Sequence, residues 1–207
     1  MNKYTLYYLK VLLLISFFSM IKVSIANDKL LVFGDSLSAS YGINLEDGWS
    51  NLLSKMLKEK NISLDVVNKS ISGETTSGGI RRLPKLLLSI NPKIIIIELG
   101  ANDGLRGLPL AQTKKNLNSM IKLSKKYKVK PLLVGIKIPP NYGKSYSRKF
   151  YDLFGQAAIE NNIPFVPFMF EGFATKKDFF LRDQIHPNEK AQVKILENIW
   201  FKLKTLI

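Results

Sequence analysis

The sequence predicts one three-layer α/β domain, in which a parallel β-sheet is covered by helices on both faces. From Lys29 onward, short apolar runs alternate with longer amphipathic ones, and this alternation is typical of strands that are each followed by a helix. The strand-like runs are almost continuously apolar at their centres, as in Ile94-Ile95-Ile96-Ile97, which suits strands buried on both faces. The 207 residues contain no internal repeat or low-complexity linker, so we expect a single domain.

Five apolar runs are expected to form the strands of a five-stranded parallel sheet: residues 30–34, 64–68, 93–99, 131–138 and 165–169. Between them, apolar residues recur at helical spacing, as Trp49, Leu53 and Leu57 do. Helices are therefore expected around residues 49–57, 77–90, 117–124 and 147–161, and a last one from Pro187-Asn188 to the carboxyl end. In such folds the functional residues lie in the loops after the carboxyl ends of the strands.

Residues 1–26 have the three zones of a secretory signal peptide, ahead of a folded domain at residues 27–207. Lys3 and Lys10 make a basic start, residues 11–21 are apolar, and Ala26 is a small residue at the expected cleavage site. The apolar run is shorter than the roughly 20 residues that a membrane-spanning helix needs. We therefore expect cleavage and a periplasmic or secreted protein, with an uncleaved anchor as the alternative because Lys22 lies in the cleavage region.

The composition limits the kinds of chemistry and the kinds of partner that the protein can have. The chain has no cysteine, which excludes disulfides, thiolate metal ligands, a catalytic thiol and a lipidated amino-terminal cysteine. Its formal net charge of +15 could attract anionic lipids, acidic glycans or nucleic acid. Because the lysines are spread along every predicted helix, we expect no nucleic-acid partner, at most a peripheral contact with anionic membrane lipids, and a monomer.

A serine and the chain's one histidine are the candidates for nucleophilic catalysis. Ser36 follows the first predicted strand, in Gly34-Asp35-Ser36, where glycine permits a sharp turn. A serine hydroxyl needs an adjacent base, which is usually histidine, and His186 is the only histidine. Asp183 lies three residues before it and can accept the Nδ1 proton, so that Nε2 stays free to act as the base.

Stabilisation of an oxyanion requires preorganised donors, each worth about 3 kcal/mol. Two further loops after strands supply candidates, the backbone N–H of Gly73 and the carboxamide of Asn102, beside the backbone N–H of Ser36. Glycine and asparagine are also ordinary turn residues, which is the alternative interpretation of both. A lone histidine cannot build a histidine-rich metal site, so we expect catalysis without a metal and without a cofactor.

These blocks together resemble the SGNH (GDSL) hydrolase superfamily, and more narrowly its bacterial periplasmic branch of thioesterases, arylesterases and lysophospholipases. The similarity rests on the blocks Gly34-Asp35-Ser36-Leu37, Ile71-Ser72-Gly73-Glu74-Thr75, Gly100-Ala101-Asn102-Asp103 and Asp183-Gln184-Ile185-His186. The resemblance implies a flavodoxin-like sheet. It also implies a triad of Ser36, Asp183 and His186, and an oxyanion hole of Ser36, Gly73 and Asn102. Ser40, Ala101 and Gln184 stand where glycine is commoner in that branch.

The resemblance implies a serine hydrolase that acts on acyl esters and thioesters, including arylesters, acyl-CoA and lysophospholipids, through an acyl-enzyme. It also places Ile138 in the acyl groove. The loop at residues 74–79 carries small residues from Thr75 to Gly79, so we expect it to move when substrate enters. The alternative is an ordinary flexible connection. Two alternatives remain open: a carbohydrate O-acetyl esterase of the same fold, and a non-catalytic protein that binds anionic polymers.

Overall fold

The computed structural model describes residues 2, 4 and 27–207 of the chain. The predicted signal peptide at residues 1–26 therefore lies outside the described residues, apart from Asn2 and Tyr4. Within the described part, no helix combines the length and the apolar character that crossing a membrane requires.

The predicted five-stranded parallel sheet is present, in the order β2-β1-β3-β4-β5. The strands are β1 (Asp28–Gly34), β2 (Leu64–Asn68), β3 (Ile94–Glu98), β4 (Lys130–Val134) and β5 (Phe165–Val166). This order is that of a flavodoxin-like fold, which confirms the fold class expected from the sequence. Since the strands are parallel, their carboxyl ends meet at one edge, where the loops after β1, β2 and β3 lie together.

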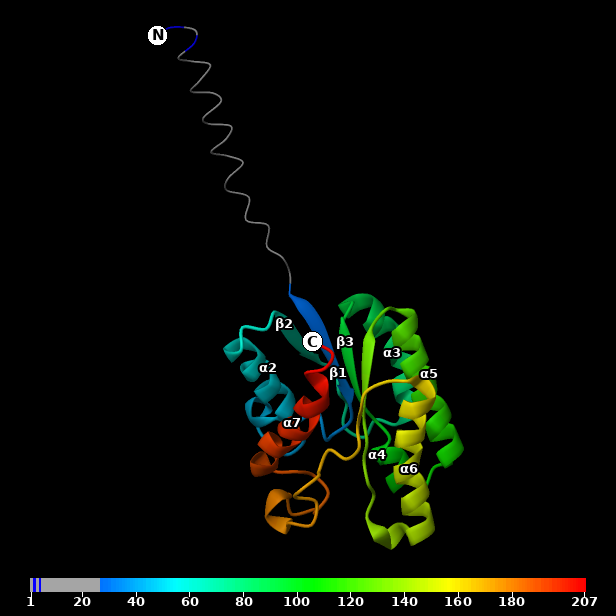
Figure 1. Cartoon of the computed structure of the whole chain (residues 1–207). Helices are drawn as coiled ribbons and strands as arrows, with labels where there is room; N and C mark the ends of the chain where they lie inside the picture. Colours follow the sequence, from blue (N-terminus) through cyan, green and yellow to red (C-terminus); the bar gives the residue numbers. More distant parts are fainter. Residues whose placement is uncertain (1, 3, 5–26) are drawn as a thin grey trace.

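Helices cover both faces of the sheet (Figure 1). On one face lie α3 (Thr76–Ile90), α5 (Leu110–Lys126) and α6 (Lys144–Asn161), and on the other lie α2 (Trp49–Glu59) and α7 (Glu189–Leu203). The central strand β3 and its neighbour β1 are enclosed between these layers, and the side chains of Leu30–Phe33 in β1 and Ile94–Ile97 in β3 have no exposed surface. Truncation of one such aliphatic side chain to alanine typically costs about 2–5 kcal/mol of unfolding free energy.

Two predicted strands end earlier than the apolar pattern indicated. The run 131–138 is a strand only to Val134, and the run 165–169 only to Val166. Pro167 has no N–H to donate to the ladder, and its carbonyl lies so close to Gly135 that a Cβ there would approach it to 2.4 Å. The chain therefore leaves the sheet at these residues while staying apolar.

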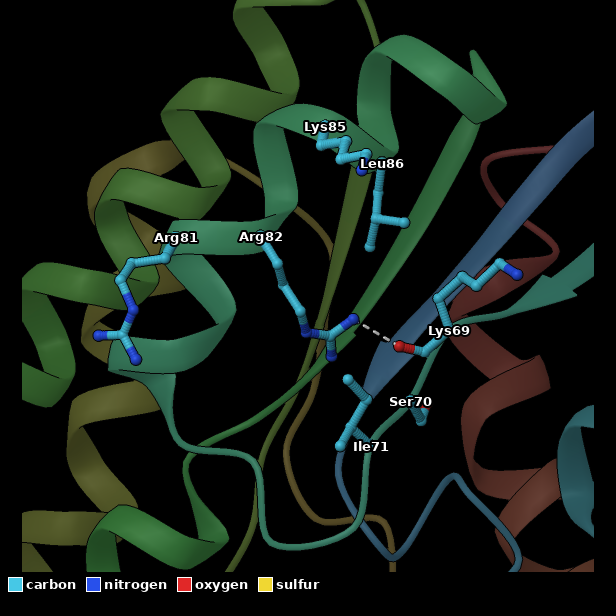
Figure 2. Close-up of a pocket in the computed structure, with 7 residues that line it drawn as sticks. All are labelled: Lys69, Ser70, Ile71, Arg81, Arg82, Lys85 and Leu86. Carbon is cyan, nitrogen blue, oxygen red and sulfur yellow. Dashed lines mark hydrogen bonds between the residues drawn. The ribbon is translucent and has the colours of Figure 1, made fainter.

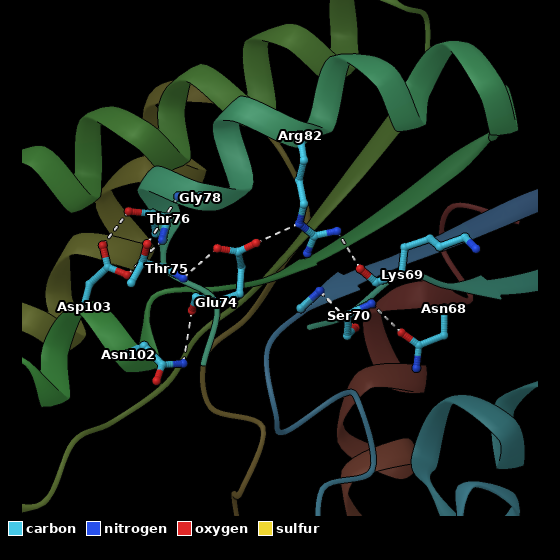
Figure 3. Close-up of polar contacts among 11 residues, drawn as sticks. Asn68, Lys69, Ser70, Glu74, Thr75, Thr76, Gly78, Arg82, Asn102 and Asp103 are labelled. Carbon is cyan, nitrogen blue, oxygen red and sulfur yellow. Dashed lines mark hydrogen bonds and ion pairs between the residues drawn. The ribbon is translucent and has the colours of Figure 1, made fainter. Parts of the chain in front are cut away.

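Residues 76–79, which were expected to belong to a loop, instead form the first turn of α3. Thr76 begins α3, and the Thr75 hydroxyl accepts a hydrogen bond from the Gly78 N–H as the helix N-cap. The Asp103 carboxylate accepts from both the backbone N–H and the hydroxyl of Thr76, which is fully buried (Figure 3). Helix capping and a buried carboxylate thus fix residues that look flexible in the sequence.

Candidate active site

Four segments at the carboxyl edge of the sheet bring the predicted site residues together. Ser36 follows β1, Gly73 lies between β2 and α3, and Asn102 lies in α4 (Ala101–Leu105), a short helix after β3 that the sequence analysis took for a loop. His186 lies in the segment between η3 (Lys177–Phe179) and α7. The neighbouring order of β2, β1 and β3 in the sheet explains why the first three residues meet.

Ser36, His186 and Asp183 form a continuous hydrogen-bonded series. The Ser36 Oγ lies 3.0 Å from the His186 Nε2, and the His186 Nδ1 lies 2.6 Å from the Asp183 Oδ2. Partial burial disfavours the charged form of Asp183, but hydrogen bonds from the amides of His186 and Ile185 and from the His186 ring outweigh it, so the pKa of Asp183 is lowered. An ionised Asp183 holds the proton on Nδ1, which leaves Nε2 facing the serine.

The turn that carries Ser36 is shaped by its neighbour Asp35. The Asp35 Oδ1 accepts a hydrogen bond from the Leu37 N–H, and its carbonyl accepts from the N–H of Ser38 and of Ala39. A Cβ on Gly34 would lie 2.5 Å from the Glu98 Oε2, so glycine is required there by close packing. This compact turn directs the Ser36 hydroxyl toward His186.

The histidine loop is held to the fold by backbone pairing and by aromatic packing. Phe180 and Pro187 form an antiparallel bridge, and the Leu181 N–H donates to the His186 carbonyl. Five aromatic rings form one cluster centred on Phe170 and Phe173: Phe168, Phe170, Phe173, Phe179 and Phe180. The rings of Phe168, Phe170 and Phe173 are buried within this cluster.

The three predicted oxyanion donors differ in what they bind. Among the described residues, neither the Ser36 N–H nor the Gly73 N–H has a hydrogen-bond acceptor. The Asn102 Nδ2 instead donates to the Asp35 Oδ2 at 3.1 Å. It also donates to the Glu74 carbonyl at 3.1 Å (Figure 3). Gly73 has φ of +78°, a conformation that favours glycine. Two backbone donors are therefore free, while the carboxamide is engaged until an oxyanion competes for it.

A pair of buried carboxyls lies directly behind the nucleophile. Asp35 and Glu98 have no exposed surface, and the Glu98 Oε2 accepts hydrogen bonds from the Ser38 hydroxyl at 2.7 Å and from the Asp35 N–H at 3.4 Å. Burial raises the pKa of Asp35 from its ordinary 3.8 to about 7. Burial, and then the charge of Asp35, raise the pKa of Glu98 well above its usual range. The pair therefore retains protons near neutral pH.

The hollow beside Ser36 is small and contains an aromatic residue that the sequence analysis missed. The Tyr41 ring lies 4.4 Å from the His186 ring, centroid to centroid. Ile138 is buried beside Gly104 and is not among the residues that line this hollow. The lining residues are Ser36, Leu37, Ser40, Tyr41, Ile43, His186, Pro187 and Gln192.

Two of the three positions where glycine was expected have a left-handed backbone conformation, which favours glycine. Ser40 has φ of +59° and Gln184 has φ of +57°, whereas Ala101 is the first residue of α4. Glu98 was not predicted as a site residue, although the sequence marks it as unusual, because it is the one acid in the apolar run 94–99. Nothing in the sequence pattern pointed to the contact of Tyr41 with His186.

The fold and the site define a class of protein: a serine hydrolase on a flavodoxin-like parallel sheet. Residues 32–193 match the GDSL-like lipase/acylhydrolase family. The chain belongs to that family, as the resemblance in its sequence blocks predicted.

Relatives of known name support the assignment. The chain is 43% identical to an arylesterase of Vibrio mimicus, over 91% of this chain and 94% of the relative. It is 38% identical to thioesterase 1/protease 1/lysophospholipase L1 of Escherichia coli K12, over 88% and 86%. A crystal structure of TesA has 44% identity and a TM-score of 0.85, and the match covers 87% of this chain and all of that one.

Proposed function

We propose that the protein hydrolyses acyl esters and thioesters, with Ser36 as nucleophile, His186 as general base and Asp183 as the residue that orients His186. The observation that carries this proposal is the hydrogen-bonded series from Ser36 through His186 to Asp183, at 3.0 and 2.6 Å. The names of the relatives, arylesterase and thioesterase 1/protease 1/lysophospholipase L1, support the substrate class.

In acylation, the His186 Nε2 takes the proton of the Ser36 hydroxyl while Oγ attacks the substrate carbonyl carbon. The resulting oxyanion accepts hydrogen bonds from the N–H groups of Ser36 and Gly73, and from Asn102 once its amide leaves its resting partners. His186 then protonates the leaving oxygen or sulfur, and the acyl-enzyme remains. In deacylation, His186 takes a proton from water, the hydroxide attacks, and Ser36 leaves with the proton restored.

Export is part of the proposal. The basic, apolar and small-residue zones of residues 1–26 support secretion to the periplasm or the medium, with cleavage after Ala26. The excess of basic residues supports a peripheral contact with anionic membrane lipids. We propose a monomer that acts on small-molecule substrates.

An organophosphonate probe tests the proposed nucleophile. It should form a stoichiometric adduct at Ser36, and Ser36→Ala should lose both labelling and turnover of nitrophenyl esters and acyl-CoA thioesters. Labelling at another residue, with activity retained in Ser36→Ala, would overturn the assignment.

A carbohydrate O-acetyl esterase is the second candidate, and the small hollow beside Ser36 favours it, because an acetyl group needs only a shallow recess. A series of esters of graded chain length separates the two. If a groove opens toward Ile138, kcat/KM should rise from acetyl to medium chains, since each buried methylene contributes about 0.8 kcal/mol. Ile138→Ala should then shift the preferred length. A maximum at acetyl that is indifferent to Ile138→Ala would favour the O-acetyl esterase.

A further inference from the structure

A turn after β2 presents the Gly73 N–H, one of the free candidate donors to the oxyanion. Ile71 donates its N–H to a carbonyl of β1, and Glu74 donates its N–H back to the Ile71 carbonyl, which closes the turn. Ser72 and Gly73, which lie between them, are exposed. Among the described residues, these two make one hydrogen bond, in which the Gly73 carbonyl accepts from the Arg106 side chain. The direction of the Gly73 N–H therefore depends on how this turn is held.

The two ends of the segment are fixed by Arg82, which reaches them from α3. Its guanidinium donates to the Lys69 carbonyl at 2.6 Å (Figure 2) and to the Glu74 carboxylate at 2.8 Å (Figure 3). The guanidinium also lies 4.1 Å from the centroid of the Phe33 ring in β1. Arg82 thus ties the chain before and after the turn to the core, while the peptide at Gly73 is left to another residue.

The middle of the turn is held by two side chains of the α4 segment. Asn102 and Arg106 stand four residues apart, and the Arg106 N–H donates to the Asn102 carbonyl at 3.1 Å, so the two side chains lie on one face of a helical turn. The Asn102 amide donates to the Glu74 carbonyl at 3.1 Å. The Arg106 Nη2 donates to the Gly73 carbonyl at 3.0 Å. Two successive carbonyls of the turn are therefore bound from one short helix.

The surroundings of Arg106 suit it to fixing this peptide. A Cβ built on Gly73 would lie 3.6 Å from the Arg106 Nη2, so the guanidinium lies beside the Gly73 Cα as well as bonding to the carbonyl. Arg106 forms no ion pair with another described residue, so its charge strengthens the bond to the carbonyl. The helix that precedes it is anchored by Asp103, whose buried carboxylate accepts from the N–H and the hydroxyl of Thr76.

Turnover increases the importance of this bond. The Asn102 amide has two hydrogens, and at rest both are engaged, one by Asp35 and one by the Glu74 carbonyl. An oxyanion that binds the amide must draw it from one of these partners. When the amide leaves Glu74, the turn loses a bond at the moment when the Gly73 N–H has to meet the oxyanion. The bond from Arg106 to the Gly73 carbonyl uses a different donor and a different acceptor, so it survives that exchange.

We propose that Arg106 is a positioning residue of the oxyanion hole, which holds the Gly73 peptide so that its N–H stays directed at the oxyanion during turnover. The inference rests on the proposed hydrolase function and adds a residue to its machinery. In this role Arg106 acts through Gly73 and not on the reacting atoms. A donor that is already in place stabilises the transition state without reorganisation, and a displacement of about 1 Å is enough to lose much of that stabilisation.

Steady-state kinetics on a neutral nitrophenyl ester test the role. Arg106→Met keeps the length of the side chain but removes every donor, and it should lower kcat about tenfold with little change in KM, because the Gly73 donor acts mainly in the transition state. This loss is smaller than the factor of about 100 to 1,000 expected when a donor is removed outright. Arg106→Lys keeps a cationic donor and should lose less than Arg106→Met. A rise confined to KM would overturn the positioning role and assign Arg106 to substrate binding.

An arginine on another helix is the matched control. Arg148 is exposed on α6 and, like Arg106, donates to one neighbouring residue, in its case Asp152. Arg148→Met should leave kcat and KM unchanged. Equal losses in Arg106→Met and Arg148→Met, or equal losses in Arg106→Met and Arg106→Lys, would overturn the proposal.

The motion of the Gly73 N–H gives a readout that does not depend on turnover. It is measured by ¹⁵N relaxation on Ser36→Ala protein, with and without Arg106→Met. The Gly73 order parameter should be about 0.85 with Arg106 present and should fall toward about 0.6 without it, while that of Gly155 in α6 stays unchanged. An unchanged Gly73 value would overturn the inference although ester hydrolysis stands. If the value falls but the native enzyme cleaves no ester, the proposed function fails and the role of Arg106 in holding the turn stands.

Discussion

The turn after β1 and the loop before α7 each contribute an aspartate to the site, and the two carboxyls differ in ionisation. Asp183 is more than a third exposed and has three hydrogen-bond donors, so its pKa is lowered. Asp35 is fully buried beside a second carboxyl, and its pKa is raised to about 7. Hydrogen bonding thus keeps one carboxylate ionised as a partner for histidine, while burial keeps the other largely protonated below about pH 7.

Replacing each aspartate with asparagine should reveal the largest difference in activity between the two positions. Asp183→Asn should lower kcat by about 10⁴, because an amide that donates to Nδ1 enforces the wrong tautomer of His186. Asp35→Asn keeps an acceptor for the Leu37 N–H and disturbs mainly one hydrogen bond to Asn102, so the loss should be about fivefold. Steady-state kinetics on one nitrophenyl ester measure both. Similar losses in the two variants would contradict the distinct roles.

Asn102 donates a hydrogen bond to Asp35 and is also a predicted donor to the oxyanion, so its replacement tests the second of these roles. Asn102→Ala should lower kcat about 100- to 1,000-fold with little change in KM, since it removes a donor used in the transition state. Asn51→Ala, at an exposed position on α2, is the control and should leave both constants unchanged. A loss confined to KM would assign Asn102 to substrate binding instead.

The buried carboxyls should give the protein an unusual dependence of stability on pH. Between about pH 4 and pH 7 the unfolded chain ionises Asp35 while the folded chain keeps it protonated. The folded state then binds more protons, so this group makes the unfolding free energy fall as pH rises, by up to about 1.4 kcal/mol per pH unit. Above about pH 7 both states are ionised and its contribution is constant.

Urea unfolding at a series of pH values tests this dependence. Asp35→Asn and Glu98→Gln should each flatten the decline relative to the native sequence. Asp183→Asn is the matched control. Because the pKa of Asp183 is lowered, its ionised carboxylate contributes to the unfolding free energy above pH 3.8, and this contribution is lost only as the pH falls below that value. A decline that persists in both buried-site variants would mean that other groups cause it.

The smallest expected effect concerns the backbone of the histidine loop. Gln184 has φ of +57°, which costs a non-glycine residue about 1–2 kcal/mol, offset in part by the greater entropy loss of glycine. Gln184→Gly should therefore raise the unfolding free energy by about 0.5–1 kcal/mol, measured as a higher urea midpoint at unchanged slope. Gln184→Ala keeps the strain and should give no increase.

The sequence predicted the elements that depend on local pattern and missed those that depend on distant contacts. The β-branched run at residues 94–97 predicted β3, and the Ser36, Gly73, Asn102 and His186 blocks predicted which loops meet. The hydrogen bonds that hold Thr76 at the start of α3 were not predicted, because their acceptor, Asp103, lies 27 residues away in the chain.

The hydrogen bond between Ser36 and His186 joins residues 150 positions apart in the chain. Bringing them together requires that the strands between them pair in register, because each parallel crossover sets the position of the next loop. Contacts of such long sequence separation form slowly and late in folding. Esterase activity is therefore a reporter of the completed fold, and its recovery after dilution from urea should lag behind the recovery of helical circular dichroism.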